Sequence, residues 1–204
     1  MLTYLLLGIT YAFAAAIQPG PFQTFIISQT LKIGWKRTLP AAFAPVISDI
    51  PIIILILLIL TNIPAGFLRF LQIGGGVLLL YLAYSSFRSF LNFEKPDTRE
   101  SKNDNTLFKA VLVNLLNPNP YLGWSLIMGP LFIKGYNQAA VNGISLIAGF
   151  YTTIVICQAG IIILFGLTKN LGPKVTRITL GFASVALAAF GVYLLIQGFT
   201  NNNL

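Results

Sequence analysis

Long apolar stretches make up most of this chain and leave it few ways to fold. A transmembrane helix needs about 20 apolar residues. Six stretches reach that length: Leu2–Leu31, Thr38–Leu60, Phe67–Leu91, Leu107–Ile133, Ala139–Leu167 and Lys174–Phe199. Only 9% of the 204 residues are charged, whereas soluble domains carry roughly a quarter. Because lipid offers the backbone no hydrogen bonds, the sequence predicts an all-α integral membrane protein with six transmembrane helices.

Basic residues are concentrated in three of the loops between these stretches. Eleven of the thirteen Lys and Arg residues lie at the loops after the first, third and fifth stretches: Lys32, Lys36, Arg37, Arg88, Lys95, Arg99, Lys102, Lys109, Lys169, Lys174 and Arg177. Cytoplasmic loops carry such an excess, so these loops are expected in the cytoplasm and both termini outside. The net charge of +8 is explained by this orientation, and no nucleic-acid partner is expected.

Two of the stretches contain closely spaced prolines. The first carries Gln18-Pro19-Gly20-Pro21, and the fourth carries Asn117-Pro118-Asn119-Pro120. Proline has no backbone N–H and clashes with the preceding helical turn, so helices 1 and 4 are expected to be broken at these Pro-x-Pro motifs. Non-helical backbone at membrane depth is tolerated where it lines a cavity, and paired breaks in corresponding places are typical of transporters with inverted repeats.

The spacing of further residues also indicates a repeat. Gly34 to Asp49 and Gly135 to Phe150 both span 15 residues, and each glycine is expected in a short turn. We expect a first three-helix repeat over 1–92, a polar cytoplasmic linker over 93–106 and an inverted second three-helix repeat over 107–204. Coincidental spacing is the alternative for these distances taken alone.

Asp49 is the only acidic residue inside an apolar stretch. It follows the basic pair Lys36 and Arg37 by about 12 residues, or roughly 18 Å of helix, which places it near the middle of a ~30 Å hydrocarbon core. A carboxylate at that depth needs a partner, a proton or water. We expect Asp49 to couple transport to protons by binding H⁺ in one orientation and releasing it in the other. The alternative is a structural carboxylate that accepts hydrogen bonds from amides freed at the first break.

The residues in and beside the breaks are the candidate substrate-binding residues. They are Gln18, Pro19, Gly20, Pro21, Asn114, Asn117, Pro118, Asn119 and Pro120. Helices that begin after the breaks would direct free N–H groups and positive dipole ends into a cavity, which suits a substrate carboxylate. Gln23 and Gln158 offer further neutral donors and acceptors, with amide contacts between helices as the competing explanation.

Aromatic and small residues have simpler interpretations. The following aromatic residues are expected at membrane interfaces, with the lining of a pathway as the alternative: Tyr11, Tyr81, Tyr84, Tyr121, Trp124 and Tyr151. Gly74, Gly75 and Gly76, together with the small residues of the sixth stretch, predict surfaces where helices pack closely.

The sequence lacks the residues and motifs that several classes of function require. It has no histidine and a single cysteine, Cys157, so neither a disulfide framework nor a metal site is expected. It has no phosphate-binding loop, zinc-binding helix or nucleophile elbow. We therefore expect no enzyme activity and no cofactor, and a secondary carrier is the simplest interpretation.

These motifs resemble the LysE/RhtB-type amino-acid exporter (translocator) family. The matching residues are Pro19, Gly20, Pro21, Gly34, Asp49, Asn117 and Pro118. The chain departs from the family pattern at Ala44 and Ser48, where glycines are common, and at Asn119, where a lysine is common. The resemblance implies export of amino acids or related small metabolites from a prokaryotic cytoplasm, in exchange for protons or another ion.

The predicted function is therefore secondary transport in the plasma (inner) membrane of a prokaryote. An amino acid, protons and the lipid bilayer are the expected partners, and a homo-oligomer is left open. A cation or metal-ion exporter on the same scaffold is one alternative, although a lone intramembrane carboxylate is a poor cage for an oxygen-preferring ion. A non-transporting membrane subunit is the other.

Overall fold

The described part of the chain is entirely helical. The computed structural model describes residues 1–18, 20–59, 65–91, 105–167 and 173–200. The α-helices in it are α1 (Leu2–Ile17), α2 (Pro21–Ile33), α3 (Trp35–Thr38), α4 (Ala44–Ile59), α5 (Ala65–Leu91), α6 (Thr106–Leu115), α7 (Pro118–Gly123), α8 (Gly129–Gln138), α9 (Ala140–Leu167) and α10 (Pro173–Thr200). A 3₁₀-helix, η1, covers Leu39–Phe43, and a π-helix, η2, covers Trp124–Met128.

The described helices include four spans that are long and apolar enough to cross a membrane. They are Trp35–Ile56, Arg69–Arg88, Ala140–Leu167 and Arg177–Thr200. The bent pair α1 and α2, whose axes differ by 63°, makes a fifth if it is counted as one span. The all-α prediction is confirmed. The fourth predicted stretch is not one uniform span, because it is divided among α6, α7, η2 and α8. Of the predicted linker, 93–104 lies outside the described residues, and α6 begins at Thr106.

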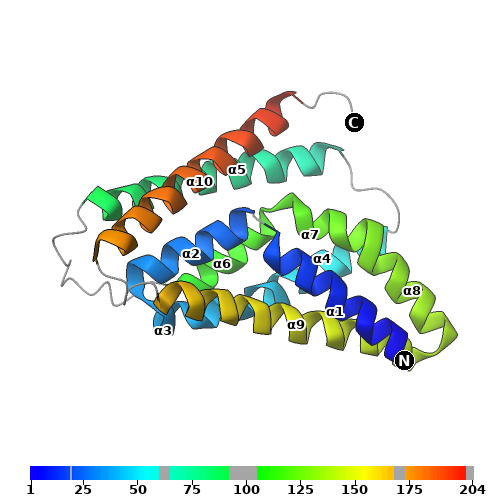
Figure 1. Cartoon of the computed structure of the whole chain (residues 1–204). Helices are drawn as coiled ribbons and strands as arrows, with labels where there is room; N and C mark the ends of the chain where they lie inside the picture. The colour runs from blue at the N-terminus through cyan, green and yellow to red at the C-terminus, as the bar shows by residue number, and fades with distance from the viewer. Residues whose placement is uncertain (19, 60–64, 92–104, 168–172, 201–204) are drawn as a thin grey trace.

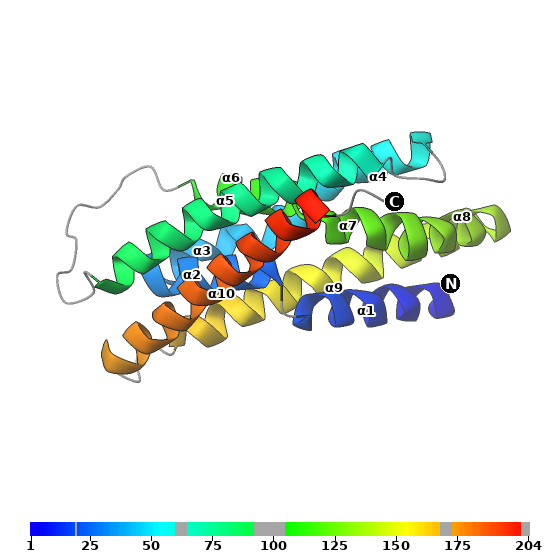
Figure 2. The same cartoon turned by 90° about the horizontal axis from the view of Figure 1, so that it is seen from above.

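Two pairs of helices run side by side (Figure 1 and Figure 2). α1 lies along α9, and α5 lies along α10. Glycines allow the close approach: a Cβ at Gly149 would lie 2.6 Å from the Leu5 carbonyl, and one at Gly76 would lie 2.9 Å from the Gly191 carbonyl. The predicted close packing at the glycines of α5 is thus confirmed. Since α1 and α9 come from different halves of the sequence, the two halves are interleaved.

The two glycines expected in turns behave differently. Gly34 joins α2 to α3 with φ 92°, a left-handed conformation that glycine adopts without strain, so the first expectation is confirmed. The second is wrong, because Gly135 lies inside α8 and is buried. A Cβ at Gly135 would lie 2.7 Å from the Tyr4 ring. The glycine at this position therefore makes room for α1.

Prolines shape the segment that carries Asp49. Pro45 has no N–H to donate to the Ala41 carbonyl, and the Ala44 N–H donates there instead, as part of the 3₁₀-helix η1. Pro51 lies inside α4. Asp49 thus lies on the turn of α4 between two positions that lack a backbone donor.

Candidate functional site

The first break leaves carbonyl groups at the end of α1, and a side chain from α2 satisfies them. In a continuous helix, Ala15 and Ala16 would accept N–H groups from positions 19 and 20, but proline at position 19 has none to give. The Gln23 side chain donates in their place: its Nε2 lies 3.2 Å from Ala15 O and 3.3 Å from Ala16 O. α2 then begins at Pro21, with Gly20 as an extended N-cap and no side-chain cap.

The second break has a cap on each side. The Leu115 carbonyl, at the end of α6, accepts a hydrogen bond of 2.9 Å from the Tyr121 hydroxyl. Asn117 is the N-cap of α7, and its Oδ1 accepts the Asn119 N–H at 3.1 Å. Pro118 takes the first helical position, where its missing N–H removes no helical bond. Side chains of this break therefore satisfy one carbonyl at the end of α6 and one N–H at the start of α7.

Asp49 is 3% exposed and accepts hydrogen bonds from three other segments. Asn114 of α6 donates to Oδ1 at 3.2 Å, whereas Trp124 of η2 and Tyr151 of α9 donate to Oδ2 at 3.3 Å and 3.2 Å. All three donors are neutral, and all come from the second half of the chain. No described residue of the first break donates to Asp49, so these hydrogen bonds give no support to the alternative in which amides of that break hold it.

The π-helix η2 and its aromatic neighbours position Trp124. The Gly129 N–H donates to the Trp124 carbonyl, five residues earlier, and a Cβ at Gly129 would lie only 2.6 Å from that oxygen. The Trp124 ring packs edge-on against Phe150, with ring centroids 6.2 Å apart, and Phe150 stacks on Tyr11. Such wide turns are frequent at functional sites, and this one carries an Asp49 donor.

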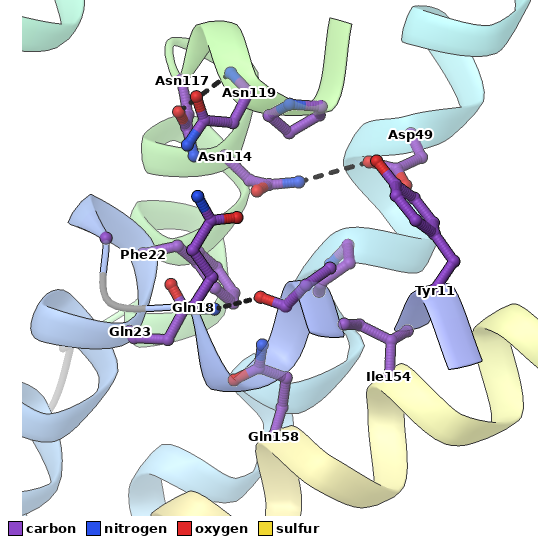
Figure 3. Close-up of a pocket in the computed structure, with 14 residues that line it drawn as sticks. Tyr11, Gln18, Phe22, Gln23, Asp49, Asn114, Asn117, Asn119, Ile154 and Gln158 are labelled. Atoms are coloured by element: carbon purple, nitrogen blue, oxygen red, sulfur yellow. Dashed lines mark hydrogen bonds between the residues drawn. The ribbon is translucent and has the colours of Figure 1, made fainter. Parts of the chain in front are cut away.

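A polar pocket lies between the two breaks (Figure 3). Its empty space is about 670 Å³, including the part that is open to solvent. The pocket is lined by Tyr11, Ala15, Gln18, Gly20, Phe22, Gln23, Pro45, Asp49, Asn114, Asn117, Asn119, Pro120, Ile154 and Gln158. Residues from α1, α2, α4, α6, α7 and α9 therefore meet at one place.

Most of the predicted site residues border this pocket. Those that line it are Gln18, Gly20, Asp49, Asn114, Asn117, Asn119 and Pro120. Pro21 and Pro118 are buried at the starts of α2 and α7 and are not among the lining residues. Pro19 lies outside the described residues. Asn114 also donates to the Ser48 hydroxyl at 2.7 Å, so it joins helices as well as facing the pocket.

Two of the three hydrogen-bond partners of Asp49 were not among the predicted site residues. Trp124 and Tyr151 were expected at membrane interfaces, but Trp124 is 2% exposed and both donate to the carboxylate. The repeat contained a signal for Tyr151, because the spacing argument aligned Asp49 with its neighbour Phe150. No comparable signal exists for Trp124, since its position depends on the π-helix.

The lining groups define what the pocket can bind. The polar side chains among them are one carboxylate, six amides and one phenol, and no lysine or arginine lines the pocket. Within the described residues, no group of three His, Cys, Asp or Glu side chains is placed to hold a metal ion. This set offers many neutral hydrogen bonds, so it suits a small polar solute.

Comparison with known proteins gives one match. The model of the family described as "LysE type translocator" matches residues 13–198, which includes both breaks and every pocket-lining residue except Tyr11. Neither the curated proteins nor the solved structures gave a significant match. The family match covers most of the chain and agrees with its apolar helices.

Proposed function

Because the chain belongs to the LysE type translocator family, we propose that it exports amino acids or related small metabolites in exchange for protons. The observation that carries the proposal is the position of Asp49. It is the one carboxylate among the pocket-lining residues, and it lies between two broken helical segments. Amides from both breaks surround the pocket and would bind the polar groups of the solute.

Protonation of Asp49 would change how α4 is held. An ionised carboxylate only accepts hydrogen bonds, whereas a protonated one also carries an O–H donor. Oδ1 accepts from Asn114, and Oδ2 accepts from Trp124 and Tyr151. Oδ2 already accepts two hydrogen bonds, so a proton on Oδ2 displaces Trp124 or Tyr151 and loosens α4 from the second half. Proton uptake and release could in this way alternate with exposure of the pocket to the two sides.

The helix contacts support two related halves, 1–92 and 107–204, that move against each other. In an inverted repeat, each contact between a helix of the first half and a helix of the second has a counterpart in which the halves exchange places. Two such pairs of contacts occur. α1 packs on α9 as α6 packs on α4, and α2 packs on α10 as α7 packs on α5. The described breaks end α1 at Ile17 and α6 at Leu115, near corresponding places in the two halves. This arrangement supports alternating access around a fixed pocket.

The distribution of basic residues supports an orientation. Lys36, Arg88, Lys109 and Arg177 lie near the end of α2, the end of α5, and the starts of α6 and α10, and these four points gather at one end of the bundle (Figure 1). The start of α1 and the end of α10 lie at the other end. We propose that the basic end faces the cytoplasm of a prokaryote and that both termini lie outside its inner membrane.

Efflux from proteoliposomes tests the proposal. Twenty radiolabelled L-amino acids are loaded in turn, and their efflux is measured with and without an imposed pH gradient. We expect at least one amino acid to leave faster with the gradient, and Asp49→Asn to abolish that acceleration. The substitution keeps the shape of the side chain, and Asn114 can rotate its amide to accept a hydrogen bond from the new group.

Ser48→Ala is the matched control. Ser48 neighbours Asp49 and accepts from the same Asn114 nitrogen, so the substitution perturbs the same packing and leaves the carboxylate in place. Its gradient-driven efflux should persist. The proposal is contradicted if no amino acid moves under either condition, or if Asp49→Asn responds to the gradient as the wild type does.

A further inference from the structure

The N-terminus of α2 opens onto the pocket without a cap. Gly20 is the N-cap and has no side chain to contribute, and Pro21 at the first helical position has no N–H. The N–H groups of Phe22 and Gln23 come next, and neither has an acceptor within the helix. Gly20, Phe22 and Gln23 all line the pocket. A helix of 13 residues also directs the positive end of its dipole to this point, which favours an anion.

Gln158 of α9 is an independent sign of a ligand. It lines the same pocket, is 1% exposed, and its Oε1 has no hydrogen-bond partner. In Figure 3 its amide extends from α9 into the pocket, on the side where Gln18 and Gln23 of the first break lie. Buried amides are nearly always hydrogen-bonded, and an unpartnered one at a pocket requires an explanation. A solute with both a donor and an acceptor would supply hydrogen-bond partners for the Gln158 amide.

The second break does not offer an equivalent place. Asn117 already caps α7 by accepting the Asn119 N–H, and the Tyr121 hydroxyl is used by the Leu115 carbonyl. Asn114 is used by Ser48 and Asp49. Among the buried side-chain atoms of the pocket-lining residues described, Gln158 Oε1 is therefore the one without a partner.

We infer that the carboxylate of an α-amino acid binds between the N-terminus of α2 and the side-chain amide of Gln158. The Gln158 Nε2 donates to the carboxylate together with the free N–H groups of α2. The ammonium, one carbon away, donates to the unpartnered Oε1. Gln158 is thus the residue that selects solutes carrying both groups on one carbon. This inference rests on the proposed function for the nature of the solute, but binding and transport are measured separately.

The test measures binding to the full chain in lipid nanodiscs. Thermal shifts with the twenty L-amino acids identify the strongest binder, and its dissociation constant is then compared with those of its decarboxylated amine and its deaminated acid. In Gln158→Met, which is nearly isosteric and apolar, we expect the amino acid to bind roughly tenfold or more weakly, because hydrogen bonds to charged groups are lost. The amine and the deaminated acid each make only one of the two hydrogen bonds to Gln158, so each should weaken by a smaller factor than the amino acid, which makes both.

Gln29→Met is the matched control. Gln29 lies on α2, is 3% exposed and has an unpartnered Oε1, but it does not line the pocket. Its substitution should leave the affinity for the amino acid unchanged. The inference is overturned if no amino acid binds, if Gln158→Met leaves the affinity intact, if it weakens amine and amino acid equally, or if Gln29→Met has the same effect.

Efflux measured on the same variants separates this inference from the proposed function. Binding that depends on Gln158, in a chain that moves no amino acid across the membrane, contradicts the proposed function and supports the binding site. Amino-acid efflux with an unchanged KM in Gln158→Met supports the proposed function and overturns the binding site.

Discussion

The α1–α2 break and the α6–α7 break each leave carbonyl groups without a helical partner, but the helices that follow them differ. At both breaks a side chain from the following helix satisfies the orphaned carbonyls, Gln23 at the first and Tyr121 at the second. At the second break Asn117 also caps α7. At the first, the N-cap is Gly20, and α2 begins without a side-chain cap.

This difference indicates a division of roles between the halves. The second half supplies Asn114, Trp124 and Tyr151 to Asp49, and its own break is closed by internal hydrogen bonds. The first half supplies Asp49 and an open helix N-terminus. In the mechanism that we propose, the first break binds the solute and the second break supports the carboxylate of Asp49, which carries the proton.

The largest effect is expected from closing the open N-terminus. In Gly20→Asp, the new carboxylate would cap α2 and occupy the place of the solute carboxylate. Gly20 has φ −163°, which any residue adopts. Amino-acid binding should weaken by roughly a hundredfold, while the melting temperature is unchanged or higher. Gly20→Ala adds no oxygen and should weaken binding far less, so equal losses in the two variants would contradict an anion site here.

The next effect concerns the backbone of the second break. A Cβ at Gly75 of α5 would lie 2.5 Å from the Leu116 carbonyl, so Gly75→Ala should push α5 from the break and destabilise the fold by about 1–3 kcal/mol. Gly66→Ala in the same helix meets nothing within 4 Å and should be neutral. Thermal unfolding in detergent compares the two, and equal melting temperatures would contradict this packing.

A smaller effect is expected from removing the carbonyl partners. Gln23→Met leaves two carbonyls of α1 without their donor and should destabilise the chain by about 2 kcal/mol. Tyr121→Phe leaves one carbonyl of α6 without its donor and should lower the free energy of unfolding by about 1 kcal/mol. Both are measured by reversible unfolding in mixed micelles. If Tyr121→Phe lowered the free energy of unfolding more than Gln23→Met does, this comparison between the two breaks would be contradicted.

The smallest effect is expected from Asn117→Ala, which removes the cap of α7. Loss of an N-cap typically destabilises by about 1 kcal/mol, and the Asn119 N–H would then depend on water in the pocket. Hydrogen exchange at Asn119 should accelerate, with slower exchange at Tyr121 unaffected. An unchanged rate of hydrogen exchange at Asn119 would show that the Asn117 cap does not stabilise the start of α7.

Much of the fold could be predicted because lipid constrains a chain so strongly. The apolar stretches predicted the ends of α5, α9 and α10 to within two residues. α1 ends at Ile17 and α6 at Leu115, each shortly before a Pro-x-Pro motif. The π-helix at Trp124 could not be predicted, since a bond from Gly129 depends on tertiary packing. The prediction of a turn at Gly135 was wrong because a glycine that makes room for the Tyr4 ring cannot be told from a glycine in a turn by sequence alone.

The candidate site was partly foreseeable for the same reason. Asp49 stands out because a carboxylate is costly in lipid, and the amides at the breaks lie next to prolines that mark them. Which break is capped could not be predicted, because it depends on whether Asn117 turns its Oδ1 toward Asn119 or toward the pocket. Gln158 lies far from both motifs in sequence and reaches the site only through the packing of α9 near α2.

The most direct test of the account is proton movement coupled to amino-acid efflux. Proteoliposomes containing an internal pH dye are loaded with the amino acid that gives the strongest gradient response and diluted into buffer of equal pH. The account predicts that the interior acidifies as the amino acid leaves, and that Asp49→Asn abolishes the acidification. Efflux without a pH change in the wild type, or acidification that persists in Asp49→Asn, would contradict it.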